Sequence, residues 1–262
     1  MDDAGVAVAE QGAQVVARVG AVLRALSARA GEPASTAEVA AATGLTRPTA
    51  HRLLAALAAE GLVDRDSGWV LGPEAYILGA VAADRYDITA LAADAVRAVA
   101  RATGESSFLS ARRGDETVCL MREEGSFPLR SHVLYEGIRF PLGVASAGLA
   151  ILAMLPEAER EAYLARADLV PDWGPGHGEG PLRQRLAAAR STGYVVNPGL
   201  IVEGSWGMAA AIFDAAGRPA WALSATGVEQ RFGPDRQAQI GRVLLDQAHE
   251  VTRRLRAGAH RP

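Results

Sequence analysis

The sequence predicts an α+β protein with a short, mainly helical N-terminal part and a larger part that mixes strands and helices. Apolar residues recur three or four positions apart through much of residues 13–61, which is helical spacing. Beyond Gly104, short strand-like runs alternate with helical segments, and turns such as 214–217 join some runs as hairpins. We therefore expect the second part to be an antiparallel sheet flanked by helices.

Composition sets limits on function. The 262 residues are 49% hydrophobic and 22% charged, a globular balance, and the net charge of −3 means that any contact with DNA must be local. The single cysteine, Cys119, cannot form an internal disulfide, and the sequence shows no signal segment and no run of 18 apolar residues. We expect a cytoplasmic protein with no membrane partner.

The first helices carry local start and stop signals. We expect residues 1–12 to be a disordered tail and residues 13–28 to form a helix. Ser35 and Glu38 form a capping box that begins a second helix. Gly44 ends that helix, because glycine adopts the left-handed conformation at little cost.

A third helix and a hairpin follow. Thr46 is a suitable N-cap, Pro48 suits the first turn, and Gly61 ends the helix. Its inward-facing stripe comprises Ala50, Leu53, Leu54 and Leu57. Residues 62–72 contain two short apolar runs around a turn at 66–68, which is typical of a hairpin.

This order of elements predicts a winged helix-turn-helix over residues 13–72, an architecture whose third helix enters the major groove of DNA. Arginine can bond guanine bidentately, and threonine and histidine can contact base edges or phosphates. The alternative, that these are solvated surface charges, is outweighed by the adjoining turn and hairpin. The residues expected to contact DNA are Thr46, Arg47, Pro48, Thr49, His51, Arg52 and, on the hairpin, Arg65.

The remaining chain is divided into a linker and a second domain. Residues 73–86 are expected to form a linker helix that can also pair with a second chain, and residues 87–262 a domain. Strand-like runs occupy 106–112, 117–123, 129–136, 193–197, 206–214 and 219–227. Helical patterns occupy about 88–103, 146–155, 156–167, 181–191 and 234–257.

Three ordered stretches resemble the IclR-type bacterial transcriptional regulators. They are TAEVAAATGLTRPTAHRLLAALAAEGLV (36–63), FPLGVASAGLAILAMLP (140–156) and GYVVNPGLIVEGSWGMAAAIFDAAGRPAWALSATG (193–227). The resemblance implies a GAF-like C-terminal domain that binds a small effector and shifts affinity for operator DNA. It also implies a homodimer or homotetramer. We expect a ligand-responsive regulator, with repression as the favoured mode.

Several residues suggest an effector site. Ser146 and Ala147 open a helix whose N-terminal amides attract anions, and Gly207 with Met208 would let a ligand approach strand backbone. Ser224 and Thr226 alternate along the last strand, so their hydroxyls point the same way. The resemblance places these positions and Asn197 around the effector cavity, with apolar walls from Leu129, Leu134, Phe140, Leu142 and Trp206. For each apolar residue, an ordinary core position is an equal alternative.

The chain departs from the family pattern at three of these places. Asn197 replaces a frequent acidic residue, Leu149 a common lysine, and Gly207 a larger or thiol side chain. These changes predict a less charged and roomier pocket. The resemblance favours a small organic acid as effector, and the space beside Trp206 suits an aromatic acid such as a hydroxybenzoate.

Two rival functions remain open. No nucleophile elbow, zinc spacing or dinucleotide-binding glycine pattern occurs, so we expect no catalytic residues, metal site or cofactor. The first rival is a small-molecule-processing α+β enzyme whose helix-turn-helix serves protein contacts, and sequence-specific DNA binding would exclude it. The second is a regulator that needs no ligand, which internal hydrogen bonds to Ser224 and Thr226 would favour.

Overall fold

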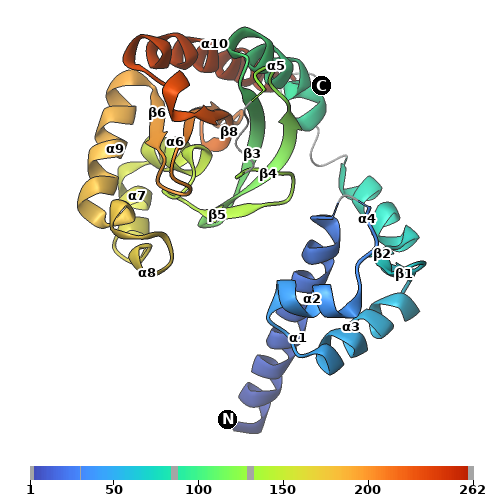
Figure 1. The fold of residues 1–262 in the computed structure, drawn as a ribbon. Coiled ribbons are helices and arrows are strands. Elements are labelled where there is room, and N and C mark those ends of the chain that lie inside the picture. The colour runs from blue at the N-terminus through green and yellow to red at the C-terminus, as the bar shows by residue number, and fades with distance from the viewer. Residues whose placement is uncertain (1–2, 30, 84–87, 129–132, 259–262) are drawn as a thin grey trace. The chain divides into compact units, whose positions relative to one another are not determined.

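The structure is a computed structural model that describes all residues except 1–2, 30, 84–87, 129–132 and 259–262. The chain forms two compact units, Met1–Asp87 and Ile88–Pro262 (Figure 1). Each unit has hydrophobic core residues of its own.

The N-terminal unit has the element order of a winged helix-turn-helix. Its helices and its two-stranded hairpin pack around Val22, Leu54 and Val63, which are fully buried. The elements are α1 (Asp3–Ser27), α2 (Thr36–Thr43), α3 (Arg47–Ala59), β1 (Val63–Arg65), β2 (Trp69–Leu71) and α4 (Pro73–Ala83).

The predicted caps of α2 and α3 are confirmed. The Glu38 N–H donates to Ser35 Oγ at 3.2 Å, and the Ser35 N–H donates to Glu38 Oε2 at 2.8 Å. Gly44 has φ of +66°, and the Thr46 side chain accepts from the Thr49 N–H. These bonds occupy backbone groups that helix ends otherwise leave unpaired, and they define where the turn between α2 and α3 begins and ends.

The first helix is longer than predicted. α1 begins at Asp3, so residues 3–12, expected to be a disordered tail, are helical in the structure. The segment is rich in alanine, the residue with the highest helix propensity, and it contains no proline to stop the helix.

The second unit is built on an antiparallel sheet. Among the described residues the sheet has six strands in the order β5-β4-β3-β8-β7-β6. The β7–β8 turn is the predicted hairpin, in which the Asp214 N–H donates to Arg218 O at 2.9 Å and Gly217 has φ of +77°. The strands are β3 (Ser106–Arg113), β4 (Glu116–Glu123), β5 (Arg139–Pro141), β6 (Tyr194–Pro198), β7 (Ser205–Phe213) and β8 (Pro219–Val228).

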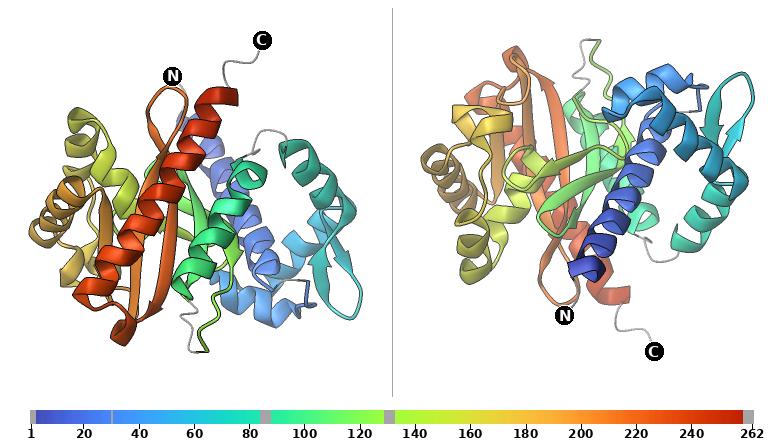
Figure 2. Two further views of the ribbon diagram at one scale, coloured as in Figure 1. Left: turned by 90° about the horizontal axis from the view of Figure 1, so that it is seen from above. Right: turned by 90° about the horizontal axis from the view of Figure 1, so that it is seen from below.

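Helices cover both faces of this sheet, as expected for a GAF-like domain (Figures 1 and 2). One face packs on α5 (Ile88–Thr103) and α10 (Pro234–Gly258). The other packs on a second set of helices that includes α6 (Ser146–Met154) and α9 (Glu179–Thr192). This set also contains α7 (Glu157–Leu164) and the short α8 (Val170–Trp173).

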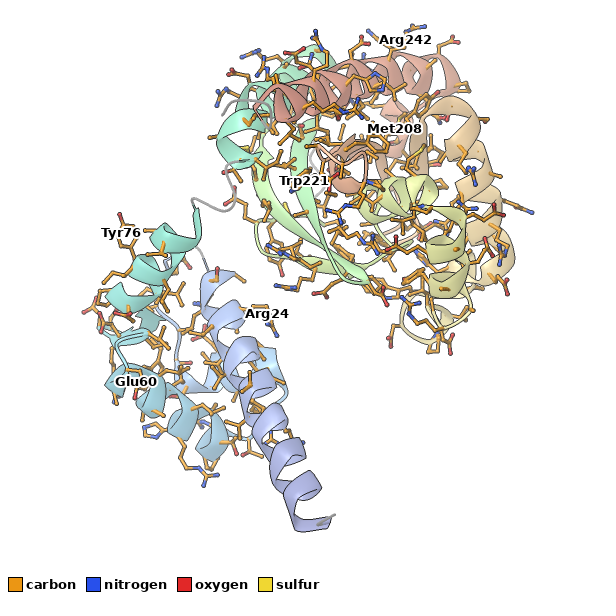
Figure 3. All side chains as sticks on the ribbon, turned by 180° about the vertical axis from the view of Figure 1, so that it is seen from behind. Arg24, Glu60, Tyr76, Met208, Trp221 and Arg242 are labelled. Atoms are coloured by element: carbon orange, nitrogen blue, oxygen red, sulfur yellow. The ribbon has the colours of Figure 1, made fainter. Side chains whose placement is uncertain are left out.

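Alternation along β7 assigns its side chains to the two faces. Ala209 belongs to the core on the α6 and α9 side, and Gly207, two residues before it, faces the same way. Met208 and Ala210 belong to the core between the sheet, α5 and α10 (Figure 3). Met208 is therefore on the opposite face from the predicted effector site.

One predicted strand is wrong. Of residues 129–136, the first four lie outside the described residues and the last four form no strand. The chain turns instead, with the Ile138 N–H donating to Tyr135 O and Gly137 at φ of +86°. Gly137 and Ile138 make backbone hydrogen bonds to Cys119, and the paired strand β5 begins at Arg139. The apolar pattern arises because Leu134 is buried in the core, not because the segment joins the sheet.

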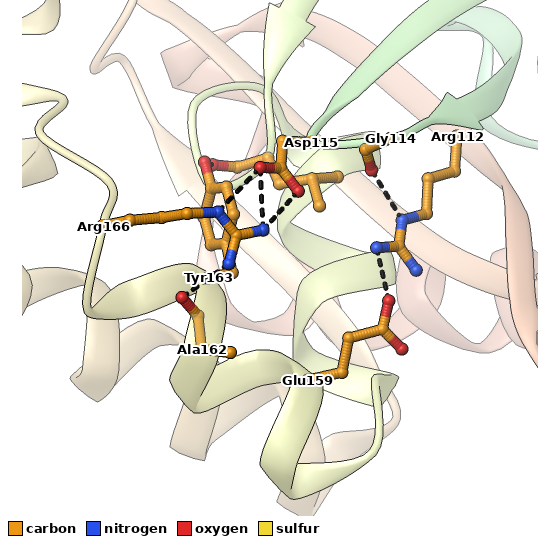
Figure 4. Close-up of polar contacts among 8 residues, drawn as sticks. Arg112, Gly114, Asp115, Glu159, Ala162, Tyr163 and Arg166 are labelled. Carbon is orange, nitrogen blue, oxygen red and sulfur yellow. Dashed lines mark hydrogen bonds and ion pairs between the residues drawn. The ribbon is translucent and has the colours of Figure 1, made fainter.

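Ion pairs fix α7 against the β3–β4 hairpin (Figure 4). The Arg166 guanidinium binds Asp115 through Nη2–Oδ1 at 2.7 Å and Nε–Oδ2 at 3.0 Å, and Arg112 pairs with Glu159 at 2.6 Å. The Tyr163 hydroxyl donates to Leu142 O at 2.5 Å, and burial raises the pKa of Tyr163 to about 12. These contacts hold the segment that leads into α6.

Candidate DNA-binding face and effector hollow

The N-terminal half of α3 presents a polar face. The side chains of Arg47, His51 and Arg52 are exposed, as are Thr46 and Pro48, and Thr49 is half-buried. Within the described part of the chain, no hydrogen bond or ion pair occupies the guanidinium of Arg47 or Arg52. The opposite side of α3 is anchored in the core by Ala50, Leu54 and Leu57. Both arginines are therefore free to meet phosphates or base edges.

Trp69 connects this face to the hairpin. Its ring is 5% exposed and its Nε1–H donates to Thr36 Oγ1 at 3.0 Å. The His51 ring lies edge-on with its centroid 6.3 Å from that of Trp69, and the Arg65 guanidinium lies 5.3 Å from the Trp69 ring. Sequence reasoning missed Trp69, although an aromatic residue in so short a hairpin was the available signal. It positions both His51 and Arg65.

The predicted effector site corresponds to a small hollow between the sheet and α6. Its volume is about 20 Å³, which is room for about one water molecule and far below the roughly 300 Å³ at which ligand pockets begin. The expectation of a roomier pocket is wrong, because the side chains of Ser146 and Thr226 take up the space that Gly207 leaves. The lining residues are Val133, Leu134, Ala145, Ser146, Asn197, Ile201, Ser205, Trp206, Gly207 and Thr226.

Two buried hydroxyls lie on this face of the sheet without a partner. Thr226 lines the hollow, and Ser224, two residues earlier on β8, faces the same side. Neither hydroxyl oxygen has a hydrogen-bond partner in the part of the chain that the structure describes. Buried polar groups are seldom left unpaired, so this pair argues against the regulator that needs no ligand.

Asn197 is held on both sides of its amide. Its Nδ2 donates to Val144 O at 2.8 Å, and its Oδ1 accepts from Arg185 Nη1 at 2.9 Å. Arginine only donates hydrogen bonds, so Oδ1 must face Arg185 and Nδ2 keeps a second hydrogen. Arg185 was not predicted; its position three residues after Leu182, beside the buried stripe of α9, was the only signal.

The approach of a ligand to Gly207 stays a prediction, and several other residues expected around the cavity lie elsewhere. A Cβ at Gly207 would lie 3.0 Å from Ser146 Oγ, so β7 and α6 come close at this point. Ala147, Phe140 and Leu142 are buried in the core and do not line the hollow, since Phe140 packs on Trp173. Met208 faces α5 and α10, and Leu129 lies outside the described residues.

The described residues offer no metal site and no reactive thiol. They contain no group of three or more His, Cys, Asp and Glu side chains able to hold a metal ion. No helix among them has the length and apolarity needed to cross a membrane. Burial raises the pKa of the Cys119 thiol to about 12, so it is not a reactive thiolate at neutral pH.

Two family models match the N-terminal unit and the C-terminal unit of the chain, in that order. The IclR helix-turn-helix domain matches residues 15–67, and the bacterial transcriptional regulator IclR C-terminal domain matches residues 80–253. The chain belongs to the IclR family. It is a DNA-binding transcriptional regulator.

Named relatives agree with the family match over most of the chain. The HTH-type transcriptional repressor AllR of Escherichia coli (strain K12) is 29% identical over 257 residues, 97% of this chain and 94% of AllR. The HTH-type transcriptional regulator KipR of Bacillus subtilis (strain 168) is 28% identical over 222 residues, 83% of this chain and 88% of KipR. Both are named as regulators, so they give the enzyme alternative no support.

A solved structure is similar over nearly the whole chain. It is an IclR homolog from Microbacterium hydrocarbonoxydans complexed with 4-hydroxybenzoate. The two chains share 26% sequence identity with a TM-score of 0.71, over 93% of this chain and 99% of that one.

Proposed function

We propose that this IclR-family chain is a cytoplasmic repressor that binds operator DNA through the polar face of α3 and responds to a small organic acid. The acid would bind in the hollow between β7, β8 and α6. The observation that carries the proposal is the pair of buried, unpartnered hydroxyls of Ser224 and Thr226 beside that hollow. A ligand with acceptor atoms would satisfy them and recover the cost of burying them.

The size of the hollow implies that the ligand must open it. A space for about one water cannot hold an acid, so Leu134, Ile201 or their neighbours must move outward. Such a movement gives the ligand a means to favour one conformation over another, which is what a change in operator affinity requires. An aromatic acid suits a site beside Trp206, and a homolog of this chain was solved with 4-hydroxybenzoate.

Exposed apolar residues on the N-terminal unit support a homodimer or homotetramer. On α4, Tyr76 is 79% exposed and Val81 is 70% exposed, and Ile77 and Leu78 are more than half exposed (Figure 3). Val16 on α1 is 70% exposed. Pairing through these side chains would remove them from water and would place two α3 helices on one operator.

Selection of bound fragments from a random DNA pool tests the proposal. Full-length protein should enrich an approximately palindromic site, and adding an acid from a panel of aliphatic and aromatic acids should change the yield of that site. A variant with both Arg47→Ala and Arg52→Ala should enrich nothing. Failure of the wild type to enrich any sequence would contradict the DNA-binding part of the proposal.

A further inference from the structure

The side chains that line the hollow are neutral, but a half-buried arginine lies behind one of them. None of the ten residues that line the hollow carries a charge. Arg185 contacts the lining residue Asn197. It is half-buried and donates to three neutral oxygens, Asn197 Oδ1 at 2.9 Å, Gly176 O at 2.9 Å and Pro181 O at 3.5 Å. Among the described residues no carboxylate lies within ion-pair distance of Arg185. Its positive charge is therefore not balanced locally.

Two other arginines, one on α9 and one on the sheet, have acidic partners. Arg183, on the same helix, pairs with Glu161 at 2.7 Å and with Glu179 at 2.9 Å. Arg122, which lies beside Phe108 on the face of the sheet that bears the hollow, pairs with Glu124 at 2.7 Å. Of these three, Arg185 alone keeps its charge without an acidic partner.

One further feature, the start of α6, adds to this positive environment. α6 begins at the hollow with Ser146, has no side-chain cap, and carries no acidic residue in its first turn. His177 adds no charge, because burial lowers the pKa of its imidazole and its Nδ1 donates to Trp173 O. Burial likewise lowers the pKa of Arg185, but the guanidinium stays protonated at neutral pH.

We propose that Arg185 determines the charge selectivity of the hollow: acting through Asn197, it makes the site accept a carboxylate and reject the neutral amide of the same shape. The inference rests on the proposed function and names its specificity-determining residue. Arg185 fixes the orientation of the Asn197 amide, which lines the hollow and keeps a second Nδ2 hydrogen, while its own charge attracts an anion. Exposed arginines lack this effect, because water screens them.

A thiol placed in the hollow measures this charge without any ligand. Ser146→Cys introduces it, and Cys119 does not interfere because its pKa is about 12. The pKa of the new thiol is read from thiolate absorbance in full-length protein carrying S146C alone, S146C/R185Q, S146C/R185K or S146C/R183Q. The R183Q change removes a charge from the same helix but on its exposed side, and is the matched control.

We expect the thiol pKa to rise by about one unit in S146C/R185Q, since an unpaired charge nearby contributes roughly 1–2 kcal/mol at an effective dielectric constant of about 20. The thiol pKa in S146C/R185K and in S146C/R183Q should be the same as in S146C alone. Glutamine can still donate to Asn197 Oδ1, so loss of packing alone would not produce this pattern. Should R185Q fail to fold, R185M keeps the aliphatic stem and gives the same comparison. Equal thiol pKa values with and without Arg185 would overturn the proposal.

Calorimetry with 4-hydroxybenzoate and 4-hydroxybenzamide tests the selectivity itself. If either probe binds the wild type, R185Q should weaken the carboxylate by about tenfold and leave the amide unchanged. An amide that binds the wild type as tightly as the carboxylate would overturn the proposal. The thiol measurement decides the question even where neither probe binds, and DNA selection tests the regulatory function separately.

Discussion

Arg47 illustrates how a single exposed residue can be tested for DNA reading. Its guanidinium is unpaired in the described part of the chain, so Arg47→Ala removes no internal contact. We expect operator affinity to fall by about 1–3 kcal/mol and sequence preference to relax, while the melting temperature stays the same. Arg242→Ala, which removes an exposed charge on α10, is the control. If Arg47→Ala and Arg242→Ala bind the operator with equal affinity in a gel-shift titration, Arg47 does not contact DNA.

The Thr226 hydroxyl is expected to lower the stability of the ligand-free protein and to strengthen effector binding. Replacing its buried, unpartnered hydroxyl by a methyl group in Thr226→Val should stabilise the ligand-free protein by up to about 1 kcal/mol, since no hydrogen bond is lost. The same change should weaken binding of an effector acid. Thr252→Val is the matched control, because the Thr252 hydroxyl donates to Ala248 O and accepts from the Phe213 N–H.

Urea unfolding and calorimetry measure these two effects. The control should lose stability where Thr226→Val gains it. If Thr226→Val destabilises the protein as much as Thr252→Val does, the Thr226 hydroxyl has a partner within the fold, and its assignment to the effector site fails.

Among the helices and strands, α2 packs against α3, and its capping box stabilises the start of α2. Ser35→Ala removes the side-chain acceptor of the Glu38 N–H and should lower the stability of the N-terminal unit by about 1 kcal/mol. Thermal unfolding followed by Trp69 fluorescence, in a variant in which the other tryptophans are replaced, would report it. An unchanged midpoint would show that packing alone holds α2.

The same box predicts a pH dependence. Hydrogen bonding to the Ser35 backbone and side chain, together with the nearby Arg29, lowers the pKa of Glu38. A lowered folded pKa means that the stabilisation is complete above the unfolded value of about 4.3 and is lost as the pH falls through the folded value. The difference in unfolding free energy between wild type and Glu38→Gln should thus be constant near neutrality and should close in acid. A difference that persists at low pH would contradict this.

These elements show what the sequence could and could not predict. Caps at Ser35, Gly44 and Thr46 follow from local backbone chemistry, and they were predicted correctly. The strand predicted at 129–136 is absent from residues 133–136, its described part, because burial of Leu134 in the core produces the same apolar pattern as a paired strand. Met208 was assigned to the wrong face, because glycine and its neighbour were considered together although strand side chains alternate.

For the whole molecule, assembly should depend on the exposed apolar side of α4. Ile77 and Val81 are four residues apart on that helix and 51% and 70% exposed. In sedimentation, wild type should have a mass that is a multiple of the 27.3 kDa chain, and the variant I77E/V81E should have a smaller multiple. Val202→Glu, at an exposed apolar site of the second unit, is the control. Identical masses for all three proteins would place the interface elsewhere.

The order of domains and the family could be predicted from the whole sequence, whereas the state of the hollow could not. Volume depends on how Leu134, Ile201 and Trp206 pack together in three dimensions, and no pattern in the chain records that. Arg185 was missed for a similar reason, since its contact with Asn197 joins a helix to an edge strand. Local rules predict the ends of elements well, but a site assembled from several elements requires coordinates.

Regulation by an acid requires that the hollow and the DNA-binding face be coupled. Fluorescence anisotropy of a labelled selected operator, measured with and without an acid that calorimetry shows to bind, tests it most directly. We expect the acid to change operator affinity by about 5- to 150-fold. Thr226→Val should abolish this change while leaving ligand-free operator affinity intact. An acid that binds the protein but leaves operator affinity unchanged would contradict this coupling.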